Sequence, residues 1–244
     1  MRLPLVFIIL ATPLAAQDAT PKLGPNATPI TADTAYLRSN DAPDYWAFNA
    51  FVKPQFTTSA CSIAAVTAAL NGLNGLPANA EDMVMSQQAL LELTANPDWA
   101  TLSAEGGDGV TFQQLVDFTT EALAADDMAG RPVTVLHPVD ITTQTTDDVR
   151  AMLTANEASA DNAVMIYFNQ GVITGDWDGP HVSLIGAYDA AADKVLILEV
   201  DQDWYTPYWT TVPVLMEAIT KPTSAEHGPL EGETGGLVMI GAPA

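Results

Sequence analysis

The chain has 244 residues and a formal net charge of −22, with 30 acidic and only 8 basic side chains. So few Lys and Arg residues argue against nucleic acid or an anionic membrane surface as a partner, since both are bound through basic clusters. The single cysteine, Cys61, excludes an internal disulfide bridge, and the length suits one domain.

The first 16 residues contain an early basic residue, then an apolar run, and end in small residues. This pattern predicts a secretory signal peptide at 1–16, so we expect an exported protein, periplasmic or secreted, with no membrane association after cleavage. Residues 17–44 are rich in Pro and Gly, which predicts an extended, partly disordered lead-in. A single domain is expected at 45–244.

Helix-forming residues follow Cys61 without interruption, and an apolar stripe recurs at helical spacing. Thr58 and Ser59 precede it and are residue types that cap helix N-termini. Cys61 is therefore predicted in the first turn of a helix, where backbone N–H groups and the helix dipole favour a thiolate. A thiolate suits a nucleophile, whereas the commoner fate of a lone cysteine is to be a small buried hydrophobic side chain. The stripe consists of Ile63, Val66, Leu70 and Leu73.

The remaining patterns predict helices early in the chain and strands later. An aromatic segment at 45–51 is expected to pack beside the Cys61 helix, and a Gly/Asp-rich loop at 169–180 to border a site. Strands at 181–188 and 194–200 are joined by a short segment, which predicts an antiparallel hairpin. This order indicates an α+β fold with two lobes. The other predicted helices span 79–93, 111–124, 146–155 and 212–219, and the other strands 132–136, 163–168 and 236–240.

A cysteine nucleophile needs a base, and the chain has three histidines. His181 opens the predicted hairpin, and Glu199 and Asp201 share one side of the returning strand. Folding the hairpin places His181 opposite one of these acids, which would orient its imidazole as the third member of a triad does. The alternatives are a hydrogen-bonded strand-end histidine and a solvent-facing glutamate. His137 follows another strand, and His227 lies in a Gly/Pro-rich segment.

Gln55 lies six residues before Cys61, a separation that lets a loop return its side-chain amide to the start of the helix. There the amide would donate a hydrogen bond to an oxyanion, together with the Cys61 backbone N–H. Taken alone this glutamine would carry no meaning, because most glutamines are surface residues. Together with Cys61, His181 and an acid, it completes the residue set of a cysteine-dependent acyl-transfer site.

These motifs resemble those of the phytochelatin synthase family from about residue 51 to residue 240. The resemblance rests on Gln55 and Cys61, the histidine strand at 181–189, the Leu-Ile-Leu-Glu-Val strand at 196–200, the Tyr-Thr-Pro-Tyr-Trp turn at 205–209 and the last strand at 235–240. It implies a papain-like, two-lobed cysteine-peptidase fold. A helical lobe would carry the nucleophile, and an antiparallel sheet lobe the histidine and the acid.

The resemblance also implies an activity on glutathione. Cys61 would attack the carbonyl between cysteine and glycine, release glycine and hold γ-glutamylcysteine as a thioester. Water would then give γ-glutamylcysteine, and a second glutathione would give a phytochelatin; we expect hydrolysis to dominate, because an exported enzyme meets little glutathione as acceptor. The implied roles are acid–base for His181, oxyanion donor for Gln55 and catalytic acid for Glu199, with Asp201 as the fallback.

The chain departs from the family's pattern where charge matters. Glu199 replaces an aspartate, and Gln202 and Trp204 stand where the family typically has an arginine and often a lysine. The chain resembles the short bacterial form, without the Cys-rich C-terminal region, so no bound cofactor is expected, and cadmium or zinc would enter as the metal–thiolate of the substrate. Two other functions stay open: a cysteine peptidase or amidase for a less acidic substrate, and a non-catalytic exported binding domain with a papain-like shell. The sequence does not predict an oligomeric state.

Overall fold

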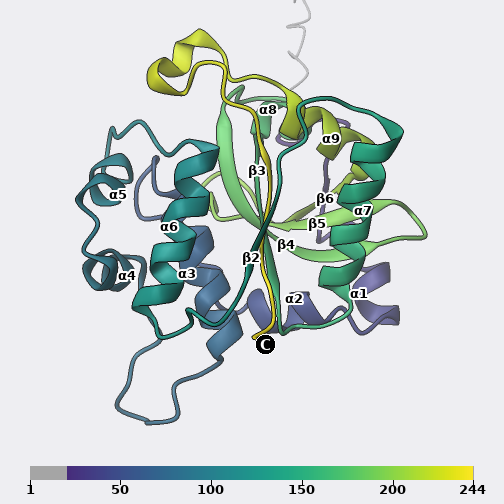
Figure 1. Ribbon diagram of the computed structural model, residues 1–244. Coiled ribbons are helices and arrows are strands. Elements are labelled where there is room, and N and C mark those ends of the chain that lie inside the picture. The colour runs from purple at the N-terminus through teal and green to yellow at the C-terminus, as the bar shows by residue number, and fades with distance from the viewer. Residues whose placement is uncertain (1–20, 244) are drawn as a thin grey trace, which may run out of the picture.

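A seven-stranded antiparallel sheet forms the centre of the computed structural model, which describes residues 21–243 (Figure 1). The predicted signal peptide at 1–16 lies outside the described residues. The strands stand in the order β1-β6-β5-β4-β3-β7-β2. They span Thr28–Pro29 (β1), Val133–Leu136 (β2), Ala163–Asn169 (β3), Pro180–Asp189 (β4), Lys194–Leu198 (β5), Tyr208–Thr211 (β6) and Gly236–Ile240 (β7).

Helices cover both faces of this sheet. In Figure 1, α3 to α6 lie on one side of the strands and α7 and α9 on the other. The helices span Ala35–Ser39 (α1), Pro43–Phe48 (α2), Cys61–Asn74 (α3), Gln87–Thr94 (α4), Pro97–Leu102 (α5), Phe112–Ala125 (α6), Thr143–Glu157 (α7), Gln170–Thr174 (α8) and Val212–Thr220 (α9), with a 3-10 segment at Ala225–Leu230 (η1). The α+β class with an antiparallel sheet is therefore confirmed.

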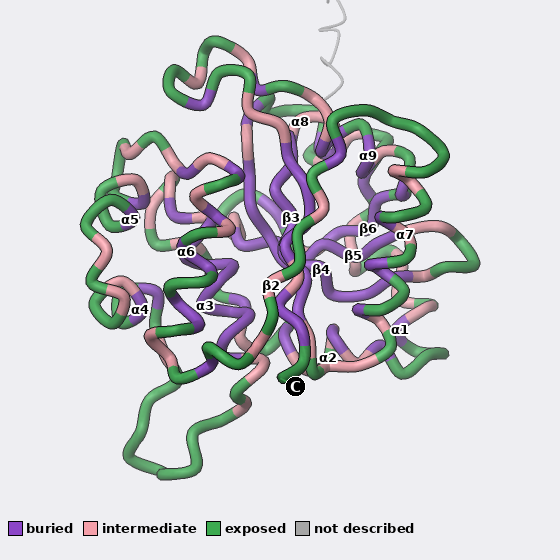
Figure 2. The backbone as a smooth tube through the Cα atoms, viewed as in Figure 1, coloured by how far each residue is buried: buried purple, intermediate pink, exposed green. Residues whose placement is uncertain are grey.

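The core has two parts, one on each face of the sheet. In β3, Met165 and Tyr167 pack with the cluster that contains α3 and α6, whereas Ile166 and Phe168 pack with the cluster that contains α7 and α9. Every residue of β3 is buried (Figure 2). This explains its uninterrupted apolar sequence, because a strand covered on both faces has no solvent-facing positions to alternate with.

Helix α3 begins at Cys61, as predicted, but it is buried all round rather than along one stripe, since every residue from 62 to 71 is buried. The predicted caps are wrong. Ala60 occupies the N-cap position without a side-chain cap, and the Ser59 hydroxyl donates instead to the Gly107 carbonyl at 2.6 Å. The aromatic segment packs on this helix as expected: a Cβ at Gly72 would lie 2.0 Å from the Phe48 ring.

Three other predictions are corrected. The helix expected at 79–93 is only Gln87–Thr94, because Ser86 provides its N-cap while the Asn79 side chain accepts from the Glu81 N–H in a turn. The lead-in is not extended throughout, since residues 28–29 pair with β6 and residues 35–39 form α1. The loop expected at 169–180 contains α8, and neither α5 nor β6 was predicted.

The hairpin of β4 and β5 carries the feature that positions the site. Its pairing runs from Asp189 opposite Lys194 to Ala187 opposite Leu196, then shifts so that Leu184 faces Leu198. Gly186 is the extra residue of this β-bulge. Without the shift, the residue after Leu198 would stand opposite Leu184 and turn to the other face of the sheet from His181, because side chains alternate along a strand.

Candidate active site

Cys61, the first residue of α3, is partly exposed in a cleft of about 530 Å³. The cleft is lined from several segments: Gln55 to Cys61, the Gly-rich loop 106–109, the start of β4 at His181, and residues of the loops that follow β5 and α9. Another cavity of similar size, about 570 Å³, lies beside α1 and α7 and contains none of the predicted site residues.

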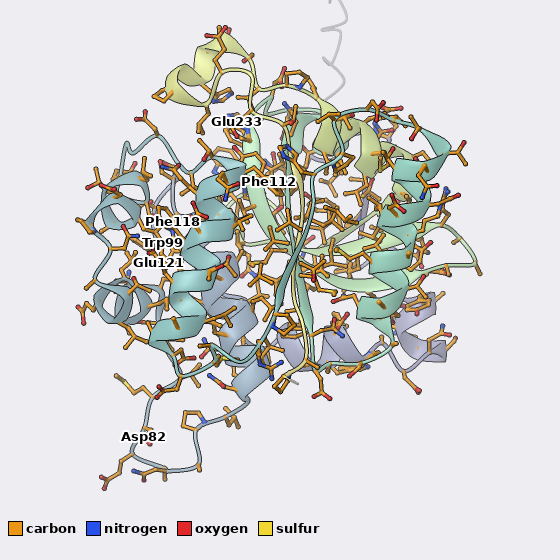
Figure 3. The ribbon with its side chains drawn as sticks, in the orientation of Figure 1. Asp82, Trp99, Phe112, Phe118, Glu121 and Glu233 are labelled. Atoms are coloured by element: carbon orange, nitrogen blue, oxygen red, sulfur yellow. The ribbon has the colours of Figure 1, made fainter. Side chains whose placement is uncertain are left out.

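The start of α3 is fixed by its neighbours rather than by a cap. The Trp99 indole N–H donates to the Ser62 hydroxyl at 3.0 Å, and Trp99 stacks on Phe118 of α6 with ring centroids 5.1 Å apart (Figure 3). Thr57 bonds the Ser103 carbonyl at 2.6 Å. These contacts hold the turn before Cys61 against α5 and α6.

His181 and Glu199 form a buried pair. The His181 Nε2 atom lies 2.6 Å from Glu199 Oε1, and the two residues are 3% and 0% exposed. Continuing the register past Leu184 brings Ser183 opposite Glu199, and the Ser183 hydroxyl is 3.2 Å from the same oxygen. Of the two acids left open by the sequence, Glu199 is the one bonded to His181.

Glu199 has hydrogen-bond donors at both oxygens. Oε1 also accepts from the Asp201 backbone N–H at 2.7 Å, while Oε2 accepts from Gln170 Nε2 at 3.1 Å and from the Tyr208 hydroxyl at 3.0 Å. Burial alone would raise the Glu199 pKa, but the charge and hydrogen bond of His181, with the hydrogen bonds from the Asp201 N–H and the Tyr208 hydroxyl, hold it below its usual value. The buried carboxyl group is therefore an anion at neutral pH.

The pKa of His181 is raised. Burial is the largest single influence and acts to lower it, but the Glu199 charge, the hydrogen bonds with Cys61 and Glu199 and the Cys61 charge together outweigh burial. Because Nε2 faces Glu199, Nδ1 is the ring nitrogen that remains for the Cys61 thiol. The geometry favours a protonated imidazole beside Cys61, which is the partner that a thiolate requires.

Asp201 lines the cleft but does not orient His181. Its backbone N–H donates to Glu199, and no hydrogen bond joins its carboxylate to another of the described side chains. Burial raises the pKa of Asp201, partly offset by the His181 charge. Asp201 therefore adds a carboxyl group to the cleft lining, but it makes no hydrogen bond to the His181 imidazole.

Gln55 lies at the same opening as Cys61. Its backbone N–H donates to the Val200 carbonyl at 2.9 Å, which ties the loop before α3 to the segment that follows β5 and contains Glu199. Its side-chain Nε2 makes a long contact of 3.5 Å to the Thr58 carbonyl, and its buried Oε1 has no partner among the described residues. The amide is thus weakly engaged in the cleft.

Sequence reasoning missed several residues around the site. Ser183 follows His181 by two positions on one strand, so the alternation of side chains would have found it. Gln170 gave no such signal, because it lies on α8. Tyr208 belongs to the motif at 205–209, but its contact with Glu199 was missed because β6 was not predicted. His227, set aside earlier, lines the cleft with its Nε2 2.6 Å from the Asp178 carbonyl.

A family model for phytochelatin synthase matches residues 32–227. The chain belongs to the phytochelatin synthase family. The matched span contains Gln55, Cys61, His181 and Glu199, starts earlier than the resemblance found from motifs, and stops before β7. A comparison with curated proteins finds no match. Membership indicates a transferase or hydrolase whose substrate is the small thiol peptide glutathione.

For a member of the phytochelatin synthase family, this chain has an acidic cleft. Its lining includes Asp108 and Asp201 and no Lys or Arg. Gln202 donates to the Glu199 carbonyl at 3.1 Å, and the exposed Trp204 lies at the cleft, with Lys22 Nζ 4.4 Å from its ring centroid. Gln202 and Trp204, which stand where the family typically has basic residues, therefore add no positive charge to the cleft.

Within residues 21–243, no group of three or more His, Cys, Asp or Glu side chains is arranged to hold a metal ion. In the same range, no helix combines the length and apolar character needed to cross a membrane.

Proposed function

We propose that this protein is an exported, cysteine-dependent enzyme that cleaves the bond between cysteine and glycine in glutathione. The γ-glutamylcysteinyl group would be held on Cys61 and passed to water or to a second glutathione. The observation that carries the proposal is the presence of Cys61, at the start of α3, in one cleft with the buried pair of His181 and Glu199. Family membership supports glutathione as the substrate.

In the first half-reaction His181 already carries the proton of Cys61, and the thiolate Sγ attacks the carbonyl carbon. A C–S bond forms and the carbonyl electrons move to oxygen. When the tetrahedral intermediate collapses, the C–N bond breaks and His181 gives its proton to the leaving nitrogen, so glycine departs. Glu199 holds the imidazole through Nε2, so Nδ1 is the atom that carries the proton from Cys61 to the leaving nitrogen.

In the second half-reaction His181 takes a proton from water as the water oxygen attacks the thioester. The C–S bond then breaks, and γ-glutamylcysteine leaves while Cys61 is restored as a thiolate beside the protonated His181. If the amino group of a second glutathione attacks instead, the product is a phytochelatin. Hydrolysis is favoured, because an exported enzyme meets little glutathione as acceptor.

Gln55 would stabilise the oxyanion of both tetrahedral intermediates. Its amide lines the cleft beside Cys61 and holds only a long bond to Thr58, so Nε2 can donate to a developing charge. The Cys61 backbone N–H, at the start of α3, would be the second donor. Two such donors match the electrostatic requirement of acyl transfer.

Three further features belong to this proposal. We propose that the fold is papain-like and has two lobes. One lobe, α3 with its neighbouring helices, forms one side of the cleft, and the sheet lobe with His181 and Glu199 forms the other. The segment at 1–16 would direct export to the periplasm or beyond the cell. Cadmium or zinc would enter as a metal–thiolate of glutathione, with no bound cofactor.

Glycine release from glutathione tests this function. The protein lacking residues 1–16 is incubated with glutathione, with and without cadmium, and glycine is measured by mass spectrometry. We expect release that is lost in Cys61→Ala and in His181→Ala, with any longer product confined to the cadmium sample. No release from a folded protein whose thiol still reacts rapidly with iodoacetamide would reject the substrate and keep the site.

A second candidate is a cysteine peptidase or amidase for a less acidic substrate. The acidic cleft favours it, because Asp108 and Asp201 repel carboxylates and no Lys or Arg of the lining offsets them. Glutathione with both carboxylates esterified separates the two candidates. Faster cleavage of the diester than of glutathione supports the less acidic substrate. A folded protein that cleaves neither and has a sluggish thiol would instead be a binding domain.

A further inference from the structure

The outer oxygen of Glu199 has its own binding arrangement, separate from the contact to His181. Tyr208 on β6 donates its hydroxyl to Oε2 at 3.0 Å, and Gln170 on α8 donates its amide at 3.1 Å. Both side chains are buried, at 0% and 1% exposure. Two neutral donors thus meet an anion in a site from which water is excluded, where hydrogen bonds to charge are strongest.

These donors explain how a glutamate serves in a position where the family has an aspartate. The longer side chain has one more rotatable bond, so its carboxylate needs additional fixing to point at one nitrogen. With Oε2 held by Tyr208 and Gln170, Oε1 is directed to His181 Nε2 at 2.6 Å. Partners on two other elements, β6 and α8, thus hold the longer side chain in place.

We propose that Tyr208 and Gln170 are positioning residues that act through Glu199 and His181 on the reactivity of Cys61. A role in catalysis rests on the proposed function. The predicted effect on the reactivity of the Cys61 thiol does not, because it can be measured without a substrate. Neither residue is part of the cleft lining, so neither is placed to contact a substrate. Their effect must therefore pass through the carboxylate.

The sign of the expected effect follows from the groups around Glu199. Its titratable neighbours are His181 on β4, Tyr208 on β6 and Asp201 in the loop after β5. Two further groups affect these neighbours: Cys61 on α3 raises the pKa of His181, and Tyr205 raises the pKa of Tyr208. The donors favour the ionised carboxyl, so removing one raises the Glu199 pKa towards its usual value. Once Glu199 is protonated it no longer stabilises the imidazolium, so the thiolate beside it is lost at a higher pH as the solution is acidified.

Alkylation of Cys61 by iodoacetamide, measured from pH 4 to pH 10, tests the proposal without any substrate. We expect Tyr208→Phe and Gln170→Met each to move the acidic limb up by roughly one pH unit, which is about a tenfold slower rate on that limb. The rate above pH 9 should stay unchanged, since the thiolate then forms without help from His181. The pair of variants guards against one of them failing to fold.

Tyr205→Phe is the matched control. It removes the same hydroxyl from a buried tyrosine three residues away, but that hydroxyl donates to Asp176, at 2.5 Å, and not to Glu199. The control should keep the wild-type profile. Unchanged limbs in both test variants, or an equal shift in the control, would overturn the proposal. Because glutathione is absent, this result is independent of whether the enzyme releases glycine.

Discussion

At the scale of single residues, the sequence predicted that an acid would lie opposite His181, but it could not decide between Glu199 and Asp201. Glu199 and Asp201 share one side of an ideal strand, so alternation alone leaves them equivalent. The structure distinguishes them by contact, since only the Glu199 carboxylate meets His181 Nε2, at 2.6 Å. That contact depends on donors from α8 and β6, which no local pattern around residue 199 contains.

The two acids should respond differently to neutralisation. Glu199→Gln replaces an anion that orients His181 and stabilises its charge, so kcat for glycine release should fall by at least about 100-fold. Asp201→Asn keeps the backbone N–H that bonds Glu199, and it should retain most of the activity. Steady-state rates of both purified variants check this, and the opposite ranking would assign the third catalytic role to Asp201.

At the scale of elements, the hairpin was predictable and its bulge was not. Two apolar runs joined by a short polar segment indicate antiparallel strands, but the extra residue at Gly186 is set by packing between the strands. A Cβ at Gly186 would lie 2.5 Å from Leu198 Cγ, and Leu198 is fully buried directly before Glu199. The glycine therefore keeps the strand register that turns Glu199 towards His181.

Gly186→Ala should disturb both stability and the site. Overpacking a buried position costs about 1–3 kcal/mol, and at this chain length each kcal/mol lowers Tm by roughly 2–4 °C. Because Leu198 must move, we also expect slower iodoacetamide alkylation near pH 6. Gly130→Ala is the control, since its Cβ would meet nothing within 4 Å. A Gly186→Ala protein with wild-type Tm and alkylation rate would show that the bulge tolerates a side chain.

Other elements show where local patterns misled the sequence reading. Helix-forming residues at 79–85 do not form a helix. The Asn79 side chain accepts a hydrogen bond from the Glu81 N–H in a turn, and the Ser86 hydroxyl accepts one from the Ala89 N–H and caps α4 instead. The short strand β6 lacks a pattern of its own and exists through its pairing with β5 and β1. Long periodic segments such as α6, with its capping box at Thr111, were predicted well.

At the scale of the whole molecule, the sequence predicted the α+β class and the family, but not the buried carboxyl group that makes stability depend on pH. Asp44 on α2 is fully buried, accepts a hydrogen bond from Asn156, and has its second oxygen without a partner among the described residues. Burial, with the charge of Glu157, raises the pKa of Asp44 to about 9. Folding therefore keeps this carboxyl protonated at neutral pH.

A raised folded pKa in an acid makes folding less favourable as pH rises. Between the ordinary pKa of 3.8 and about 9, the unfolded state releases the proton that the folded state retains, so stability falls across that window. Asp44→Asn removes the ionisation, and its Tm should exceed that of wild type at pH 8 by more than at pH 5. Thermal melts at both values check this; an equal difference at both would contradict a buried neutral Asp44.

The proposed function requires Cys61 to carry a γ-glutamylcysteinyl thioester during turnover. Intact-protein mass spectrometry detects this intermediate after brief mixing with glutathione and an acid quench, with a phosphine reductant present to prevent mixed disulfides. We expect a mass gain equal to glutathione minus glycine, located on Cys61 and absent from Cys61→Ala. Glycine release without that adduct on Cys61, or with an adduct on another residue, would contradict it.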